Sequence, residues 1–419
     1  MDRLIVNGRK RLEGTIIING AKNAVLPMIA GALLTKEEVI LNNTPSLQDV
    51  RIMAELSQKI GTKIRIDDNS MSLRAHNLIE KEMPRSLTEE IRYSLLMIGA
   101  LLPHFGKVRI PLPGGCLIGT RKIDSHVLGL NALGAEIEMN ERYIEARTNG
   151  LCGGGITFEF PSVGATENTM IAACLADGTS TIKNVAKEPE IIDLANFLNS
   201  MGAEIKGAGT DTIKIDGVKK LDGTNYSIIP DRINTGTYIV AAAITGGDIL
   251  IKNTNLDYLK SVKAKLCEIG IEITETDEGV NAVAPETIQP VDIVTEVYPG
   301  FPTDMQPIIT PLLSLADGES RIKETIFDKR FNHVAELGKM GADIEVDDDT
   351  AIINGVDGLK GAQIVAPDLR AGAALVLAGL AAEGETVIDN VYQIDRGYEN
   401  IEGKLRGVGA NIKRHIFSE

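Results

Sequence analysis

The sequence of 419 residues contains no tryptophan, only four cysteines and only five histidines. The cysteines are widely scattered and form no CxxC pair, so we expect no disulfide framework. The histidines show no HxxxH or comparable spacing. The sequence therefore predicts neither a metal site nor a metal cofactor.

Long apolar runs and an excess of positive charge are also missing. The longest apolar runs, at residues 24–34 and 372–382, are shorter than the roughly 20 residues that span a bilayer. The formal net charge of −15 argues against a general binder of nucleic acid or anionic membranes. The first residues are charged where a signal peptide would need an apolar segment. We expect a cytoplasmic protein with no nucleic-acid or membrane partner, whereas protein partners cannot be predicted.

One sequence unit recurs six times along the chain. Each copy ends in Gly-Ala or a close variant followed by a short β-rich run, and successive glycines are 68 to 73 residues apart. These six glycines are Gly61, Gly134, Gly202, Gly270, Gly341 and Gly409. A glycine in this position suits the left-handed residue that ends a helix. Six units larger than a solenoid repeat suggest two domains of three units each.

The front half of each unit is an apolar, alanine-rich helix, which a short strand, a loop and a second, amphipathic helix follow. The first helices are expected at residues 24–34, 95–102, 169–176, 237–244, 308–315 and 373–382. This alternation predicts an α/β or α+β fold. A single α/β barrel would require strict strand–helix alternation, but here two strands tend to fall together.

The segment from Pro111 to Asp124 combines a thiol with positive charge. It reads PLPGGCLIGTRKID, so Cys116 follows two glycines and precedes Arg121 and Lys122. Glycines let the backbone approach a ligand closely, and cations lower a thiol pKa and attract anions. We interpret Cys116 as a reactive thiol near an anionic substrate, in preference to a small buried hydrophobe.

Other polar residues fall at equivalent places in the repeats. One set lies at the start of the alanine-rich helices: Lys22 with Asn23, Arg92, Asp304 and Arg370. A second set lies in the loop before the second helix: Cys116 with Arg121 and Asp124, Lys187 with Glu188, Asp328 with Arg330, and Asp395 with Arg396. Helix N-termini attract anions, and arginine grips phosphate and carboxylate bidentately. Together they predict an anion-binding cavity.

Several of these residues have a plainer interpretation. Asp304 could simply cap the following helix, which local sequence makes about as plausible as a catalytic role. His126 and His333 are expected to be structural or to support the residues that contact substrate. Cys152, Cys174 and Cys267 lack nearby cations and are assigned to packing.

Several motifs in order resemble the UDP-N-acetylglucosamine enolpyruvyl transferase family over the full length. They are NGAKNA (19–24), PGGCLIGTRKID (113–124), PSVGATEN (161–168), KEPEIIDLANFL (187–198), PDRINTGT (230–237), FPTDMQP (301–307), DLRAGAALVLAG (368–379) and DRGYE (395–399). The resemblance implies an inside-out α/β barrel of two domains, each with three repeats. One domain would hold residues 22–229 with a mobile Cys116 lid, the other residues 1–21 plus 230–419, and the active site would lie in the cleft between them.

The implied reaction moves the enolpyruvyl group of phosphoenolpyruvate to the 3-hydroxyl of UDP-N-acetylglucosamine without a cofactor, the first committed step of peptidoglycan synthesis. By resemblance, Cys116 is the proton donor and Asp304 the base. Lys22, Arg121 and Arg396 would hold the phosphate and carboxylate, with Asn23 also on phosphoenolpyruvate. Nucleotide-sugar contacts would be Arg92, Arg121, Lys122, Ile123, Asp124, Ser125, Ser162, Val163, Gly164, Asp304 and Ile326. Arg330 and Arg370 match further active-site positions.

Two positions depart from the family pattern. Phe160-Pro161 stands where many relatives carry a Lys-Val pair that contacts the nucleotide, and Asn234 stands where Glu is common. The sister enzyme acting on shikimate 3-phosphate lacks the Pro-Gly-Gly-Cys segment. A catalytically silent paralogue would have no need to keep both Cys116 and Asp304. Both remain as alternatives to the transferase interpretation.

Overall fold

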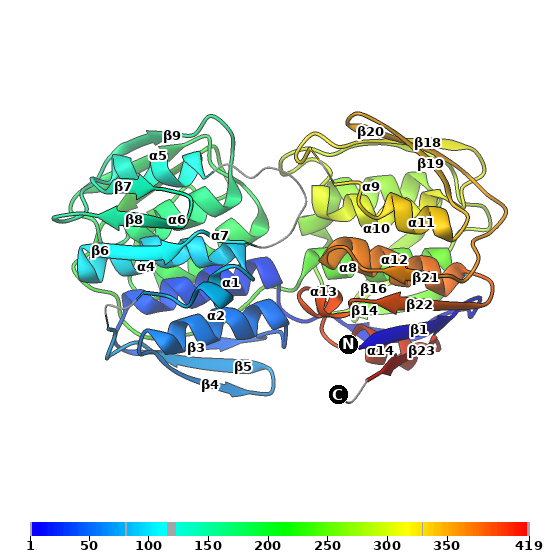
Figure 1. The fold of residues 1–419 in the computed structure, drawn as a ribbon, viewed down its shortest axis with the longest axis horizontal. Coiled ribbons are helices and arrows are strands. Elements are labelled where there is room, and N and C mark those ends of the chain that lie inside the picture. Colours follow the sequence, from blue (N-terminus) through cyan, green and yellow to red (C-terminus); the bar gives the residue numbers. More distant parts are fainter. Residues whose placement is uncertain (1, 80–81, 115–122, 329, 417–419) are drawn as a thin grey trace. The chain divides into compact units, whose positions relative to one another are not determined.

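The computed structural model describes residues 2–79, 82–114, 123–328 and 330–416. These residues form two compact units (Figure 1). The middle unit contains the described residues of 20–229, and the terminal unit contains residues 2–19 together with those of 230–416.

The middle unit is built from three sheets. Their strand orders are β13-β3-β5-β4, β6-β8-β7 and β11-β12-β10-β9. The strands are β3 (Glu38–Asn42), β4 (Lys63–Asp67), β5 (Ser70–Arg74), β6 (Lys107–Pro111), β7 (Glu136–Met139), β8 (Tyr143–Arg147), β9 (Gly155–Thr157), β10 (Thr179–Lys183), β11 (Glu204–Lys206), β12 (Thr212–Asp216) and β13 (Thr224–Ser227). The helices are α1 (Lys22–Gly31), η1 (Ala32–Leu34), α2 (Gln48–Lys59), α3 (Arg85–Thr88), η2 (Arg92–Leu95), α4 (Leu96–Phe105), α5 (Asp124–Ala132), α6 (Val163–Ala173) and α7 (Pro189–Ser200).

The terminal unit repeats this plan. Its sheets have the orders β21-β22-β1-β23, β15-β16-β14-β2 and β17-β18-β20-β19. The strands are β1 (Arg3–Asn7), β2 (Glu13–Ile17), β14 (Asp248–Lys252), β15 (Glu272–Thr276), β16 (Gly279–Val283), β17 (Asp292–Val294), β18 (Glu319–Lys323), β19 (Asp343–Asp347), β20 (Thr350–Asn354), β21 (Gln363–Val365), β22 (Glu385–Asp389) and β23 (Asn411–His415). The helices are α8 (Arg232–Ile244), η3 (Leu256–Leu259), α9 (Lys260–Glu268), η4 (Thr303–Met305), α10 (Gln306–Leu313), α11 (Val334–Lys339), α12 (Leu369–Ala381), α13 (Tyr392–Asp395) and α14 (Ile401–Gly407).

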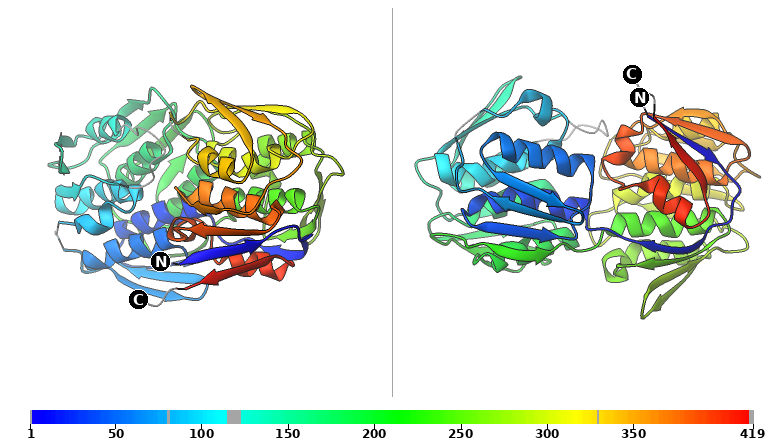
Figure 2. Two further views of the ribbon diagram at one scale, coloured as in Figure 1. Left: turned by 45° about the vertical axis from the view of Figure 1, so that its right-hand side comes forward. Right: turned by 90° about the horizontal axis from the view of Figure 1, so that it is seen from below.

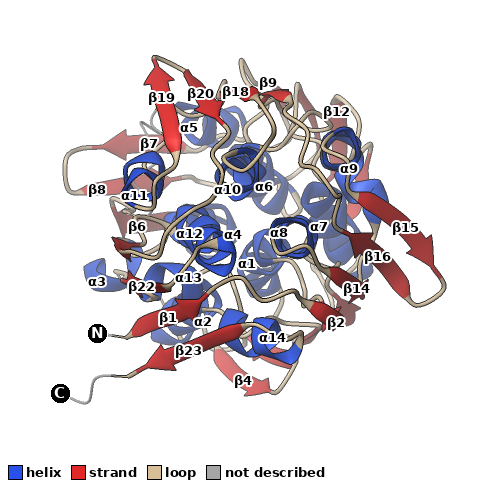
Figure 3. Ribbon diagram, turned by 90° about the vertical axis from the view of Figure 1, so that its right-hand side faces the viewer, coloured by secondary structure: helices blue, strands red, loops and turns tan. Residues whose placement is uncertain are grey.

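In each unit the alanine-rich helices lie inside and the sheets outside. Helices α8, α10 and α12 pack against one another, and Figure 3 shows them at the centre of the terminal unit with strands around them. Every residue of α8 is buried, which explains why these helices are apolar on all sides. In the middle unit α1, α4 and α6 pack in the same way. The mixed α/β class predicted from the sequence is confirmed. Five of the six central helices begin two to six residues before the predicted starts, and α4 begins one residue after its predicted start.

Glycine permits two features of this packing. The six repeat glycines all have positive φ angles, between 84° and 107°, which confirms the predicted helix ends. Gly99 on α4 lies so close to α6 that an added Cβ would be 2.4 Å from Asn168 Oδ1. A larger residue there would force the two helices apart.

The N-terminal strand completes the last repeat. In other repeats the strand after the second helix forms a hairpin with the next strand, as β19 does with β20. Strand β23 instead pairs antiparallel with β1, which also pairs with β22. Figure 2 shows β1 in blue beside β23 in red. The two ends of the chain therefore meet in one sheet.

Candidate active site

The predicted polar residues lie at the starts of the central helices. Lys22 is the first residue of α1, and Arg92 opens η2, which leads into α4. Asp304 lies in η4 directly before α10, and Arg370 is the second residue of α12. This placement agrees with the repeat pattern, while the roles of these residues remain predictions.

In the terminal unit, Asp304 is held by two buried arginines. Arg330 Nη2 donates to Asp304 Oδ1 at 2.6 Å. Arg370 donates to Oδ2 from Nη2 at 3.1 Å and from Nε at 3.2 Å. The arginine side chains are 3% and 1% exposed and the aspartate is 26% exposed. Each carboxylate oxygen of Asp304 is thereby held by one buried arginine.

This geometry bears on the helix-cap interpretation of Asp304. The residues at the N-cap positions of η4 and α10 are Pro302 and Met305, and neither makes a side-chain capping hydrogen bond among the described residues. The Asp304 carboxylate binds the arginines from the loop before α11 and from α12. Asp304 is therefore not the N-cap residue of α10 but part of a charged cluster, and its catalytic role remains a prediction.

Arg370 is fixed by its surroundings. Its guanidinium lies 5.4 Å from the centre of the Tyr398 ring. The Tyr398 hydroxyl pairs with the Thr237 hydroxyl at 2.9 Å, and burial raises the Tyr398 pKa above its ordinary value. Asp368 caps α12 by accepting from the backbone N–H groups of Arg370 and Ala371. The cluster is thus rigid on the α12 side.

Arg396 is a further buried arginine of the terminal unit. It is 6% exposed, and its Nη1 donates to Gln393 at 3.1 Å. The preceding residue, Asp395, accepts two hydrogen bonds from Arg414 on β23, at 2.6 and 2.8 Å. The C-terminal strand thereby anchors the turn that carries Arg396.

In the middle unit, Lys22 is paired with a residue that the sequence did not reveal. Its Nζ lies 2.8 Å from Asp49 Oδ2, and the two side chains are 7% and 1% exposed. Asp49 lies in the first turn of α2. Its only signal in the sequence is its place at the start of a second helix of the repeat. This buried pair fixes the lysine at the N-terminus of α1.

His126 joins the segments that carry the predicted nucleotide-sugar residues. Asn168 Nδ2 donates to His126 Nδ1 at 3.1 Å and to the Leu95 carbonyl at 3.2 Å. An added Cβ on Gly164 would lie 3.2 Å from the His126 ring. Burial and the nearby Arg92 lower the His126 pKa to about 3. A neutral histidine therefore holds together the starts of α4, α5 and α6, which agrees with the structural role expected for it.

The flanking residues of this region adopt ordinary helix-start geometry. Ile123 and Asp124 begin α5, with Asp124 in its first turn. Ser162 caps α6 by accepting from the backbone N–H of Ala165 at 3.4 Å. Phe160, at the departure from the family pattern, is 48% exposed. The nearby surface therefore presents an aromatic ring in place of a cation.

Glu167 on α6 lies near two other glutamates of the middle unit, Glu188 and Glu190. Burial, together with Glu190 and Glu188, raises the Glu167 pKa well above its ordinary value. Glu167 lies on α6, and neither of its carboxyl oxygens has a hydrogen-bond partner in the part of the chain that the structure describes. The sequence pattern did not single out this residue. Its burial and the two neighbouring glutamates favour the neutral form of this acid.

Other predictions fare differently. Cys116, Arg121 and Lys122 lie outside the described residues. Lys187 forms an ion pair with the exposed Asp211. Cys174 is buried, which raises its pKa to about 12. The packing role assigned to Cys152 and Cys267 is wrong, because both are exposed.

Two features are absent from the described residues. Within 2–79, 82–114, 123–328 and 330–416, no group of three or more His, Cys, Asp or Glu is arranged to hold a metal ion. Over the same ranges, no helix is long and apolar enough to cross a membrane.

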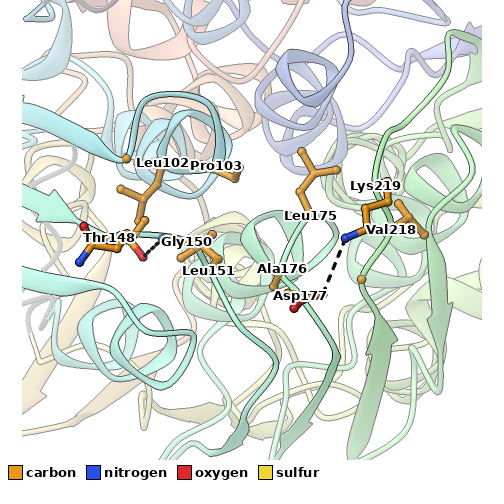
Figure 4. Close-up of a pocket in the computed structure, with 13 residues that line it drawn as sticks. Leu102, Pro103, Thr148, Gly150, Leu151, Leu175, Ala176, Asp177, Val218 and Lys219 are labelled. Carbon is orange, nitrogen blue, oxygen red and sulfur yellow. Dashed lines mark hydrogen bonds and ion pairs between the residues drawn. The ribbon is translucent and has the colours of Figure 1, made fainter.

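A pocket of about 400 Å³ lies away from the predicted residues (Figure 4). It is lined by residues that include Leu102 near the end of α4 and Leu175 just after α6. Asp177 and Lys219 form an ion pair of 3.9 Å on its wall. None of the residues that line it was predicted to bind substrate, and it lies at the opposite helix ends from Arg92 and Ser162.

Known proteins resemble this chain over its full length. The family model described as EPSP synthase (3-phosphoshikimate 1-carboxyvinyltransferase) matches residues 6–405. UDP-N-acetylglucosamine 1-carboxyvinyltransferase 1 of Caldanaerobacter subterraneus subsp. tengcongensis is 50% identical over 412 residues, covering 98% of this chain and 99% of that protein. The protein of the same name from Carboxydothermus hydrogenoformans is 50% identical over 414 residues, covering 99% and 98%.

Solved structures share the fold. The enolpyruvyl transferase NikO from Streptomyces tendae superposes with a TM-score of 0.89 at 24% identity, covering 99% of this chain and 98% of that one. EPSP synthase from Acinetobacter baumannii gives 0.76 at 18% identity, covering 99% and 100%. The predicted enolpyruvyl transferase fold is confirmed. With half of its residues identical to these curated relatives over nearly the whole length, the chain belongs to the UDP-N-acetylglucosamine 1-carboxyvinyltransferases, transferases of the wider EPSP synthase family.

Proposed function

We propose that this chain transfers the enolpyruvyl group of phosphoenolpyruvate to the 3-hydroxyl of UDP-N-acetylglucosamine and releases phosphate. The observation that carries the proposal is the identity of about half of all residues, over nearly the full length, with relatives named for this reaction. The two buried arginines around Asp304 support it, because both substrates are anionic.

The reaction needs a base at the sugar and an acid at phosphoenolpyruvate. The 3-hydroxyl loses its proton as its oxygen bonds to C2 of phosphoenolpyruvate, and C3 gains a proton. The resulting tetrahedral ketal then loses a proton from C3 as the C2–O bond to phosphate breaks, which restores the double bond. General acid–base catalysis of such steps contributes about 10²- to 10⁴-fold.

Asp304 is our candidate for the base. Arg330 and Arg370 stabilise its charged form, and the 26% exposure of its side chain leaves part of it open to a substrate hydroxyl. Cys116 is our candidate for the acid, on the family resemblance alone.

The remaining predicted residues would bind and orient the substrates. Lys22, Arg121 and Arg396 would hold phosphate and carboxylate groups and offset charge on the intermediate. Asn23 would assist at phosphoenolpyruvate, and the residues around His126 would contact the nucleotide sugar. The pairing of Lys22 with Asp49 supports such a role, because the carboxylate fixes the lysine in one place.

A role in peptidoglycan precursor synthesis, and with it in cell-wall growth and division, follows from this function as a proposal. Sensitivity to fosfomycin is part of the same proposal. The cytoplasmic location expected from the sequence remains a prediction.

Two alternatives predict different products. Transfer to shikimate 3-phosphate has weaker support, since the EPSP synthase structure is 18% identical and supports the fold alone. A silent paralogue would release no phosphate from either acceptor. Phosphate release should therefore be measured with phosphoenolpyruvate and each acceptor in turn, with the product confirmed by mass.

The expected result is turnover with UDP-N-acetylglucosamine only. D304N should lower it by about 10²- to 10⁴-fold, as loss of a general base does. The matched control is E319Q, at an exposed carboxylate of β18. Turnover with shikimate 3-phosphate alone would establish the sister activity, and no turnover with either acceptor would establish the silent paralogue.

A further inference from the structure

Glu324 is a buried carboxylate just after β18, and it is 3% exposed. Its Oε1 accepts hydrogen bonds from the Thr295 hydroxyl at 3.0 Å and from the backbone N–H groups of Ile326 at 2.9 Å and Phe327 at 3.2 Å. Its Oε2 accepts from the Thr303 hydroxyl at 2.8 Å. Four donors suit a carboxylate, which only accepts, and they offset the cost of burying it.

On one side, Glu324 is linked by hydrogen bonds to Asp304. The Thr303 hydroxyl donates to Glu324 and accepts from Arg330 Nη1 at 3.0 Å. Arg330 Nη2 then donates to Asp304 at 2.6 Å. A hydroxyl has a single proton, so its donation to Glu324 turns the oxygen lone pairs toward the guanidinium. Without that carboxylate the threonine proton would be free to rotate toward Arg330.

On the other side, Glu324 fixes the turn that contains Ile326. The backbone N–H groups of Ile326 and Phe327 both point at its carboxylate. Thr325, which lies between Glu324 and Ile326, donates its backbone N–H to the Thr295 hydroxyl at 2.9 Å. One buried group therefore connects the candidate base with the backbone of a predicted nucleotide-sugar contact.

We propose that Glu324, acting through Thr303 and Arg330, is a positioning residue that sets the Asp304 carboxylate relative to the sugar hydroxyl. The role rests on the function proposed above. Such placement matters because a misplacement of about 1 Å can cost about 10²-fold in rate. None of the sequence patterns singled out Glu324 or Thr303.

The decisive variant is T303V, which replaces the hydroxyl with a methyl group of similar size. The other three hydrogen bonds to Glu324 remain, so the fold has little reason to change. T303S keeps the hydroxyl and serves as the conservative rescue. E324Q replaces an acceptor oxygen with a donor, and E319Q on the same strand is the exposed control.

We expect T303V to lower kcat by about 10- to 100-fold while KM for both substrates changes by less than about threefold. T303S should recover most of the lost turnover. E324Q should also lower kcat, and T303V/E324Q should be no slower than the slower single variant, because both act through one chain of contacts. Thermal melting of each protein gives the folded fraction by which kcat is corrected.

Three results would overturn the positioning role while the wild type remains active. They are a T303V variant with wild-type kcat per folded molecule, a T303S variant as slow as T303V, and multiplicative losses in the double variant. If E324Q fails to fold, the T303V and T303S pair decides alone. A wild type without turnover would instead overturn the proposed function, and this role with it.

Discussion

Lowering the pH should destabilise the folded protein, because His126 gains a proton in the unfolded chain while it stays neutral in the folded chain. The ring is 7% exposed, Asn168 donates to its Nδ1, and Arg92 adds a positive charge nearby. Burial and that charge lower its pKa from the ordinary 6.5 to about 3. The perturbation is a change of buffer from pH 7.5 to pH 5.5.

The sign and size of the effect follow from proton linkage. Below pH 6.5 the unfolded chain binds a proton at His126 and the folded chain does not, so the free energy of unfolding falls as the pH falls toward 3. One pH unit corresponds to about 1.4 kcal/mol. At pH 5.5, one unit below the unfolded pKa, His126 should cost the middle unit about 1.4 kcal/mol. His333, whose pKa burial and Arg330 also lower to about 3, should cost the terminal unit a similar amount.

Two measurements check this. The ¹³Cε1 NMR signal of His126, assigned by its absence in H126Q, should not titrate between pH 8 and pH 5. In urea unfolding, H126Q should lose about 1.4 kcal/mol less than the wild type between pH 7.5 and pH 5.5. Because this comparison is a change with pH, a constant loss of stability in the variant cancels. A His126 signal with a midpoint near 6.5, or equal pH dependence of the two proteins, would refute the reasoning.

Three further predictions concern the middle unit. The pKa of Glu167 is raised, so the folded chain keeps a proton that the unfolded chain releases above about pH 4.5. The variant E167Q should therefore gain stability over the wild type as the pH rises from 5 to 8. A difference in stability that stays constant with pH would contradict this. D49N removes the carboxylate beside buried Lys22 and should lower the free energy of unfolding by about 3 kcal/mol. The control E55Q changes an exposed pair on the same helix and should lower that free energy by less than about 1 kcal/mol. Equal urea unfolding curves for the two variants would contradict the prediction. C116S should lose most turnover because a hydroxyl is a far weaker acid, C116D should keep more, and intact mass should place a fosfomycin adduct on Cys116; a fully active C116S would end the proton-donor role.

Much of the fold could be predicted from local pattern. The six glycines mark helix ends because only a left-handed residue ends such helices, and all six have positive φ. The central helices are apolar on every side because they are buried on every side. The exposed positions of Cys152 and Cys267 were missed, because the packing assignment depended on the absence of nearby cations, which does not report burial.

The sequence by itself determined the six repeats, the α/β class, and the presence of charged residues at the starts of the central helices, because these depend on residue types at regular spacing. Only the tertiary structure decided which charges meet. Asp304 contacts Arg330, 26 residues away, and Arg370, 66 residues away. Arg330 lies in the same repeat as Asp304 and Arg370 lies in the next, so these contacts depend on how elements pack within and between repeats, which no local periodicity records. For the same reason, the contacts of Asp49 with Lys22 and of Glu324 with Thr303 could be identified only from the folded structure.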